Sequence, residues 1–526
     1  MGLPKNGWRF VGLGGLFLLL GTIFSVGYHH PDEHFQIIEF ALQKLGRISD
    51  KELPWEFKEE MRPALQPILA MVGMNGCELI GISSPFTIAF FLRLVSAGFA
   101  FYGMLRLCKG LLQEVRETKF KQWFLFLSFN LWFWSYSAIR FSSENWSASC
   151  FVWGFVLLME ALRRGESFER EVEDFDWGSW LTISKLIISG VLLGLSFVFR
   201  FQLVLMIGGL MGWLVLVRKT NWRQLGLVIL GIVFGIGVGA LADRYFYGHW
   251  VNTFWNYYIQ NIVLHKAAGF GVSPWYFFML EFINRTVPPF SLVMMLVVAL
   301  FFVLFWKHPI TWCLVPFLLV HFMIGHKEVR FLFPAFAFFP FMLVGGWKSW
   351  TEFLEGKRRK WGKWGSWRKK KELRGGRSTI NWGRWEKGFV GLFVTINTVA
   401  LIGAMGKPAS DKIGLFKAIY DSPREKETNV YFVERNPYQE LNFTQHFYFR
   451  KGLNMIQVAK EAVFLPNPGL KKGLVIFDRA SLPNASWRKT HRLVYASLPA
   501  WVSQLDWNGW VERSDGYWVY ETSPNL

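Results

Sequence analysis

A dense cluster of ionisable side chains follows the first apolar run of the chain, Val11 to Val26. The six residues His29–His34 hold two carboxylates and three imidazoles. Pro31 suits the first position of a helix, which would place Asp32 and Glu33 in a first turn that favours anions. A carboxylate at a membrane surface can act as a general base. Asp32 is therefore the first candidate catalytic residue, Glu33 the second and His30 a supporting residue, the alternative being a solvated loop without a role.

A second cluster of ionisable side chains separates two apolar runs far along the chain. It comprises His321, His326, Lys327, Glu328 and Arg330. Arginine and lysine neutralise phosphate oxygens without a metal ion. We therefore expect His326, Lys327 and Arg330 to bind an anionic group, with Glu328 pairing with and orienting Arg330. His321 precedes the cluster on the same predicted helix and is a supporting candidate.

Three further arginines are candidates for the same site. Arg62 lies in the proline-bracketed segment Arg62–Pro67, and Arg200 lies in a turn between two apolar runs. Either segment could instead be a polar turn without a site role. Arg93 lies inside an apolar run, where a charge costs about 2.5–3.5 kcal/mol on insertion scales. It therefore needs a partner or a cavity, and a packing role is equally open.

Composition places these residues in a polytopic membrane protein. The chain has 526 residues, 52% of them hydrophobic, and a formal net charge of +20; the mean hydropathy is +0.23. Basic residues concentrate beside apolar runs, as membrane topology requires, so we expect no nucleic-acid partner. Eleven runs are long enough to be candidate spans: 8–27, 86–107, 122–139, 146–162, 182–199, 202–217, 224–241, 287–306, 310–325, 331–347 and 389–405.

The distribution of basic residues predicts which connectors face the cytoplasm. With the N-terminus inside, an eleven-span count puts the basic connectors there too. The outward connectors are then 28–85, 140–145, the turn at Arg200, 242–286, the turn at 326–330 and the tail from 406. Nearly all the polar clusters fall in this set, although they were not used to set the orientation. They therefore indicate one site on the outer face, where the early acids and the later cations should meet.

Two parts of the chain differ from the apolar spans. Residues 406–526 contain strand-like segments at Val430–Val433 and Leu474–Phe477 and a hairpin-like segment at 509–521, which predict a small soluble α/β domain. The basic connector 348–387 interleaves Lys and Arg with Trp, which is typical of a cytoplasmic loop on anionic lipid. We therefore expect two domains: a transmembrane catalytic domain, 1–405, and the outer α/β domain, 406–526.

The motifs together resemble glycosyltransferase family 22. They are His30–Glu33, Arg62–Pro67, Tyr247–Trp250 with Asn256, Pro274–Trp275, and His321 with His326–Phe331. The family belongs to the polytopic class-C (GT-C) glycosyltransferases and includes enzymes of glycosylphosphatidylinositol (GPI) and dolichol-linked oligosaccharide synthesis. The likeness is nearest to the third GPI mannosyltransferase branch and covers residues 8 to about 345.

The resemblance implies a GT-C fold with about eleven transmembrane helices and an inverting transfer on the non-cytoplasmic face. It implies a polyprenyl-phosphate mannose donor, a lipid-linked glycan acceptor, and no metal or other cofactor. Asp32 falls on the acid of the family's first outward loop. We expect a bacterial inner membrane or endoplasmic reticulum location and no obligate protein partner. A transporter or lipid flippase is the alternative; it would need intramembrane charges and two related halves, and the sequence has no internal repeat.

Overall fold

The computed structural model forms two compact units. The first, here called the helical unit, comprises Met1–Thr22, Glu59–Ile68 and Arg93–Gly406; the second, the sheet unit, comprises Ile23–Lys58, Leu69–Leu92 and Lys407–Leu526. Within these bounds the structure describes residues 4, 6–168, 177–354, 384–422, 428–433, 435–440, 442–459, 463, 471–497 and 516–522.

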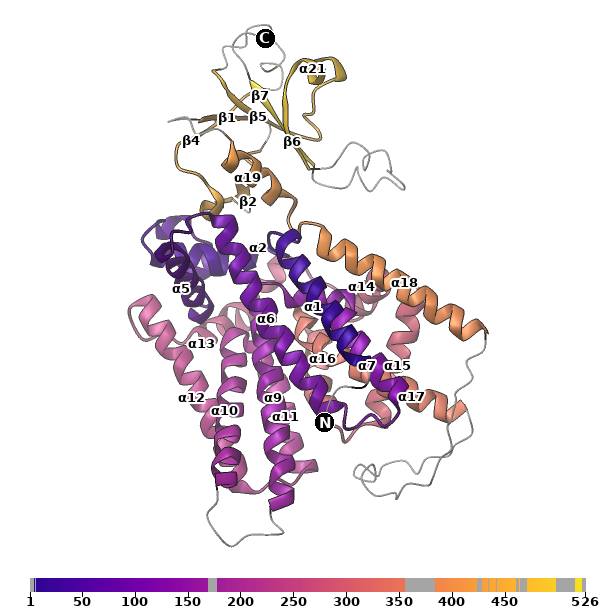
Figure 1. The fold of residues 1–526 in the computed structure, drawn as a ribbon. Helices are drawn as coiled ribbons and strands as arrows, with labels where there is room; N and C mark the ends of the chain where they lie inside the picture. Colours follow the sequence, from indigo (N-terminus) through magenta and orange to yellow (C-terminus); the bar gives the residue numbers. More distant parts are fainter. Residues whose placement is uncertain are drawn as a thin grey trace. The chain divides into compact units, whose positions relative to one another are not determined.

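The helical unit is built almost entirely from apolar helices (Figure 1). Its α-helices are α1 (Gly7–Phe24), α6 (Pro85–Leu111), α7 (Thr118–Asn130), α8 (Trp132–Ala138), α9 (Ser143–Phe168), α10 (Trp177–Phe199), α11 (Val204–Gly212), α12 (Trp222–Tyr247), α13 (Thr253–Tyr258), α14 (Phe277–Thr286), α15 (Phe290–Leu304), α16 (Pro309–Met323), α17 (Phe339–Leu354) and α18 (Arg384–Gly406). Shorter 3₁₀ or π turns are η3 (Phe201–Leu203), η4 (Trp213–Val217), η5 (Ile259–Val263), η6 (Lys266–Phe270) and η7 (Val329–Ala337).

Six helices in the described residues are long and apolar enough to cross a membrane, which makes the chain a multi-pass membrane protein. They are Gly7–Phe24, Pro85–Leu111, Ser143–Arg163, Trp180–Phe199, Trp222–Tyr247 and Lys387–Gly406. Two bent pairs, α15 with α16 and η7 with α17, raise the number to eight if each pair is one span.

The remaining apolar runs form helices that are short or broken, which is where the structure differs from eleven regular spans. Run 122–139 is divided at Leu131, whose backbone is extended between α7 and α8. The chain turns by 119° between α15 and α16, where Pro309 begins a new helix. Run 331–347 starts as the 3₁₀ segment η7 with Pro334 inside it, and proline lacks the N–H that a regular helix needs.

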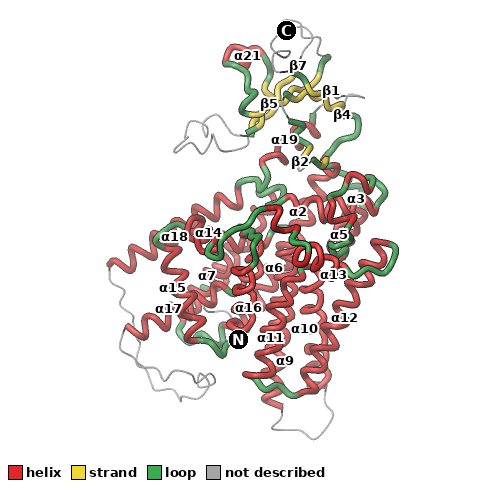
Figure 2. The backbone as a smooth tube through the Cα atoms, turned by 180° about the vertical axis from the view of Figure 1, so that it is seen from behind, coloured by secondary structure: helices red, strands yellow, loops and turns green. Residues whose placement is uncertain are grey.

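Glycines let α10 and α12 pack with their backbones in contact, and α9 lies along the other side of α10 (Figures 1 and 2). A Cβ atom added at Gly190 would lie 2.2 Å from the carbonyl oxygen of Val228, and one at Gly231 would lie 2.2 Å from that of Ile187. Small residues at such crossings drive helix association in lipid, where the hydrophobic effect offers little. This packing fixes the end of α10, which leads into Arg200.

The sheet unit contains most of the connector 28–85, except residues 59–68. Its helical elements are α2 (Pro31–Glu33), the π-helix η1 (His34–Glu39), α3 (Phe40–Lys44), η2 (Asp50–Glu52), α4 (Trp55–Lys58), most of α5 (Leu65–Leu79), the start of α6, α19 (Asp411–Asp421), η8 (His446–Tyr448) and α21 (Ala485–Thr490). The helix that the sequence predicted to begin at Pro31 is thus present, and a π segment follows its first turn.

A five-stranded mixed sheet completes this unit. Its order is β4-β1-β5-β7-β6, with β1 parallel to β4 and β5, and β7 antiparallel to β5 and β6. The strands are β1 (Thr428–Phe432), β4 (Leu453–Gln457), β5 (Gly473–Asp478), β6 (Leu493–Ala496) and β7 (Tyr517–Thr522), and β2 (Gln439–Glu440) pairs separately with β3 (Phe443–Thr444). The strands predicted at Val430–Val433 and Leu474–Phe477 are confirmed. Residues 509–515 of the predicted hairpin and 355–383 of the basic connector lie outside the described residues.

Candidate active site

Glu144 holds two arginines together inside the helical unit. Its Oε1 atom lies 2.7 Å from Nη1 of Arg200 and 3.3 Å from Nη1 of Arg330. The side chains of Glu144, Arg200 and Arg330 are only 1%, 8% and 7% exposed. Because buried charges must be paired, one carboxylate shared between two guanidinium groups holds both of them in place. Such an arrangement suits an anionic ligand with several oxygens.

Glu328 extends this cluster toward His326. It accepts a hydrogen bond from Nε of Arg330, and its other oxygen lies 2.9 Å from Nε2 of His326. The pairing of Glu328 with Arg330 that the sequence predicted is therefore present. The Phe331 ring lies close to both arginines, with the guanidinium carbons of Arg200 and Arg330 at 5.1 and 5.8 Å from its centroid. The aromatic face and the two carboxylates together limit where the guanidinium groups can point.

Lys327 is a buried lysine that fastens two loops. Its ammonium donates to the carbonyl oxygen of Ser273, at 2.8 Å, and to that of Ile324 at the end of α16. Burial lowers the pKa of Lys327 below its usual value. With two of three N–H groups on carbonyls, Lys327 positions the loop after η6 and keeps one donor for another acceptor. The sequence assigned Lys327 only to binding an anionic group. In the structure its ammonium also binds two backbone carbonyls.

His321 lies beneath the cluster on α16. Its Nδ1 atom is 2.7 Å from the carbonyl oxygen of Phe317, and its ring centroid lies 6.2 Å from that of Phe331. The Nε2 atom is buried and has no hydrogen-bond partner among the described residues. His321 therefore supports Phe331 from below.

The segment that carries Arg62 is clamped by α12 and α13. Asp243 accepts hydrogen bonds from the Ala64 N–H, at 2.7 Å, and from the Thr253 hydroxyl, at 2.8 Å. The Tyr247 hydroxyl donates to the carbonyl oxygen of Arg62 at 2.8 Å. These bonds connect two motifs that the sequence only placed on the same face.

Tyr257 then connects Arg62 to the neighbourhood of Arg200. The guanidinium carbon of Arg62 lies 5.8 Å from the Tyr257 ring centroid. Gln202, two residues after Arg200, donates to the Tyr257 hydroxyl at 2.8 Å. All the predicted site residues of the helical unit except Arg93 thus belong to one connected group.

Arg93 has a different environment. Its Nε and Nη2 atoms donate to the carbonyl oxygen of Thr22, at 3.3 and 3.2 Å, near the end of α1. Helix ends carry carbonyls without intrahelical partners, and a buried arginine satisfies one of them. Of the two roles that the sequence left open for Arg93, this contact favours packing.

The acidic residues Asp32 and Glu33 lie in the sheet unit. Pro31 begins α2, and the His30 imidazole accepts a hydrogen bond from the Asp32 N–H. His30 Nδ1 also lies 3.5 Å from the Asp32 carboxylate, which is 22% exposed. Glu33 is buried and accepts from the His29 N–H at 3.2 Å. Asp32 is thus the more accessible carboxylate, and His30 is placed to orient it.

Sequence reasoning missed Glu144, Asp243 and Tyr257 as contributors to this site. Glu144 lies in the first turn of α9, within residues 140–145 that the sequence marked only as an outward connector. Its partners follow 56 and 186 residues later, so no local spacing announces the pairing. A carboxylate at the start of an apolar helix was the only available signal.

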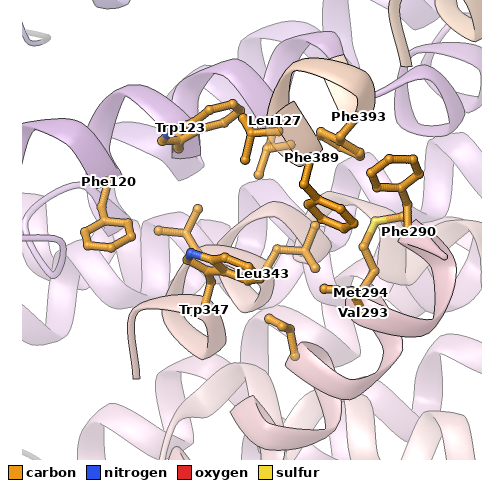
Figure 3. A pocket seen from close by; sticks show the side chains of 13 residues that line it. Phe120, Trp123, Leu127, Phe290, Val293, Met294, Leu343, Trp347, Phe389 and Phe393 are labelled. Carbon is orange, nitrogen blue, oxygen red and sulfur yellow. The ribbon is translucent and has the colours of Figure 1, made fainter. Parts of the chain in front are cut away.

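A separate pocket in the helical unit is entirely hydrophobic (Figure 3). Its empty volume is about 710 Å³, and 13 side chains from α7, α15, α17 and α18 point toward it. Among them are Phe120, Trp123, Phe290, Trp347 and Phe389. Without a charged side chain in its lining, this pocket suits a hydrocarbon chain and offers nothing for a phosphate or a sugar. The charged side chains of the predicted site in the helical unit lie elsewhere, in the Glu144 cluster.

Among the described residues, no group of three or more His, Cys, Asp or Glu side chains could hold a metal ion. The four cysteines are buried and unpaired with one another.

The sequence was compared with known proteins. The Alg9-like mannosyltransferase family matches residues 16–407. GPI alpha-1,2-mannosyltransferase 3 of Bos taurus is 23% identical over 59% of this chain and 53% of its own length. Mannosyltransferase APTG1 of Arabidopsis thaliana is 22% identical over 60% of this chain and 54% of its own length. The chain spans about half the length of the curated relatives it matches.

Among solved structures, the chain is similar to ArnT from Cupriavidus metallidurans in the apo state, with a TM-score of 0.48 and 12% identity over 99% of this chain and 98% of the other. The same protein bound to undecaprenyl phosphate gives a TM-score of 0.48 and 11% identity over 98% of both chains. The family match covers most of the sequence and agrees with the motifs that indicated glycosyltransferase family 22. The chain therefore belongs to the Alg9-like mannosyltransferase family.

Proposed function

We propose that this protein is an inverting glycosyltransferase that moves a mannose-like sugar from a polyprenyl-phosphate donor to a lipid-linked glycan. The reaction takes place on the periplasmic or lumenal face of a bacterial inner membrane or the endoplasmic reticulum. Family membership and the mannosyltransferase names of its relatives support the class of reaction. They also favour transfer over the alternative of a transporter or lipid flippase. The single observation that carries the proposal is the buried pair of arginines on Glu144.

The leaving group explains why such a pair is useful. When the bond between the anomeric carbon and the donor phosphate oxygen breaks, its electron pair stays on the lipid phosphate. Arg200 and Arg330 are already fixed by Glu144, so little reorganisation is needed as that charge develops. Their planar guanidinium groups match phosphate geometry, and the remaining donor of Lys327, the His326 imidazole and Arg62 assist.

Asp32 is the proposed base. It takes the proton from the acceptor hydroxyl while the hydroxyl oxygen forms the new bond to the anomeric carbon. Because attack and departure occur on opposite sides of that carbon, one displacement inverts the configuration and needs no carboxylate nucleophile. Glu33 is the second candidate for the base, and the His30 imidazole holds the turn at Asp32 by accepting from its backbone N–H. No metal or other cofactor takes part in this proposal.

Transfer of mannose in membranes tests the proposal. Membranes from cells that produce the protein are supplied with polyprenyl-phosphate mannose, and lipid-linked glycans are followed by mass spectrometry. Asp32→Asn keeps the size of the side chain but removes the base, so transfer should stop while the protein level stays unchanged. Glu78→Gln, which removes only an exposed ion pair with Arg47, is the matched control and should retain the activity. Transfer by Asp32→Asn at the wild-type rate would remove Asp32 from its role.

A further inference from the structure

The π-helix η1 directly follows the acidic residues and is closed by a buried side-chain pair. His34 Nε2 lies 2.7 Å from Glu39 Oε1, and the two side chains are 2% and 1% exposed. A π-helix repeats its hydrogen bonds every five residues, so residues five apart lie on one face of it. The pair at 34 and 39 therefore has the spacing that holds this wide turn in register.

Residues from the far end of the sequence complete this pair. The Phe447 N–H donates to Glu39 Oε1 at 3.1 Å. The Tyr448 ring stacks on the His34 ring, with centroids 5.5 Å apart and planes at 15°. The Phe447 N–H and the Tyr448 ring thus contact the two members of the His34–Glu39 pair. Both Phe447 and Tyr448 belong to η8 in the sheet unit.

A second contact holds the chain just before the acidic residues. The Tyr28 hydroxyl donates to Glu440, and Gln445 donates to both the Tyr28 oxygen and Glu440, each at 2.9 Å. Burial and the nearby Glu440 carboxylate raise the pKa of Tyr28, so the phenol stays protonated as the donor. The N–H of Ala409 also donates to the carbonyl oxygen of Val26 at 2.8 Å.

These two contacts bracket the acidic residues. Tyr28 lies four residues before Asp32, and His34 and Glu39 lie two and seven residues after it. Each bracket is held by residues 440–448, which run from β2 through β3 to η8. We propose that residues 440–448 form a positioning clamp that fixes Asp32 and Glu33 for transfer, with Glu39 and Tyr28 as the residues it grips. This inference rests on the proposed role of Asp32.

The chemistry of Glu39 argues against simple packing. Its second oxygen, Oε2, is buried and has no hydrogen-bond partner among the described residues. A buried carboxylate of this kind is costly, and well-packed apolar side chains would stabilise the fold at least as well. The carboxylate adds directional hydrogen bonding, because only an acceptor can bind the Phe447 N–H and His34 at once.

The clamp is tested on the full-length protein in detergent by two measurements. The first is hydrogen exchange of the peptide that contains residues 29–45. The second is steady-state transfer kinetics with polyprenyl-phosphate mannose. In Glu39→Ala and Tyr448→Ala the backbone amides of 29–45 should exchange faster than in the wild type. A small displacement of a reacting group lowers kcat by about 10²-fold, whereas the KM for the donor should not change because the Glu144 cluster is untouched.

Conservative variants separate positioning from folding. Tyr448→Phe keeps the stacked ring and should restore both exchange and kcat to nearly wild-type values. Asp421→Asn removes an exposed ion pair with Lys417 on α19 in the same unit and should change neither measurement. Exchange that is unchanged in both alanine variants overturns the clamp, and so does faster exchange with a wild-type kcat.

Failure of the proposed base has a different signature. If Asp32→Asn transfers mannose normally, Asp32 is not the base, whatever the exchange of residues 29–45. If Asp32→Asn is inactive and the clamp variants remain fully active, the proposed base is supported and the proposed clamp is contradicted. The two proposals therefore fail independently.

Discussion

The cations of the helical unit and the acids of the sheet unit are held in place by different means. Arg200 and Arg330 are fixed by buried ion pairs with the shared carboxylate of Glu144, and Arg330 also pairs with Glu328. Asp32 is held mainly through its neighbours in the chain, and its own carboxylate stays 22% exposed. A group that stabilises developing charge is more effective when it is rigid and shielded from water. A base must instead remain accessible, because it receives a proton from an incoming hydroxyl.

Loss of the base should give the largest effect. Because general-base catalysis contributes about 10²–10⁴-fold, Asp32→Asn should lower kcat by at least that factor. Donor binding should change little, since the guanidinium groups remain in place. Steady-state rates at several donor concentrations separate the two quantities. A variant with normal kcat and raised KM would instead make Asp32 a donor-binding residue.

Removing the shared carboxylate should mainly affect stability. Glu144→Ala leaves two buried arginines without their common partner, and breaking such a buried pair costs about 3–5 kcal/mol. The expected result is a lower melting temperature in detergent and little folded protein. Glu144→Gln keeps an acceptor oxygen and should fold better, with weaker donor binding. Equal stability of Glu144→Ala and the wild type would show that Glu144 does not hold the cluster.

For donor binding, the planar geometry of the Arg330 guanidinium should matter more than its charge. Arg330→Lys keeps the charge but loses the planar donors that contact Glu144 and Glu328. We expect the donor KM to rise by about tenfold, the equivalent of 1.4 kcal/mol. Arg47→Lys is the matched control, because Arg47 forms an exposed pair with Glu78, and it should leave KM unchanged. An unaltered KM in Arg330→Lys would mean that a point charge at this position is enough for donor binding.

The clamp on the Arg62 segment should give the smallest effect. Tyr247→Phe removes only the hydrogen bond to the Arg62 carbonyl, worth about 1 kcal/mol. Donor KM should rise a few fold, with kcat nearly unchanged. Tyr258→Phe on the exposed part of α13 keeps its ring against Trp255 and is the control. A large fall in kcat for Tyr247→Phe would mean that this tyrosine contacts substrate.

Much of this arrangement could be predicted from local sequence. Apolar runs indicate helices in a membrane, and clusters such as His30–Glu33 and His326–Arg330 stand out because charges are costly beside lipid. The strands at Val430–Val433 and Leu474–Phe477 follow from short runs of β-branched, aromatic and aliphatic residues. Whether the early acids and the late cations meet around one substrate stays a prediction.

Other features depend on tertiary contacts that no local pattern contains. Glu144 becomes a site residue only through Arg200 and Arg330, which come from distant turns. The π-helix His34–Glu39 is invisible to a search for a period of 3.6, because its side-chain pair is five residues apart. The break at Leu131 has no proline or glycine to announce it. Tertiary packing, rather than local sequence, determines these three features.

Photolabelling with a donor analogue tests the central claim most directly. A polyprenyl-phosphate mannose analogue with a photoreactive group on the sugar, next to the phosphate, is activated on the full-length protein in membranes, and the labelled peptides are mapped by mass spectrometry. If the acids and the cations act on the same sugar phosphate, label should appear on peptides that contain 29–36 and on peptides that contain 326–331, and excess unlabelled donor should remove both. Specific label on only one of these two segments would contradict the account.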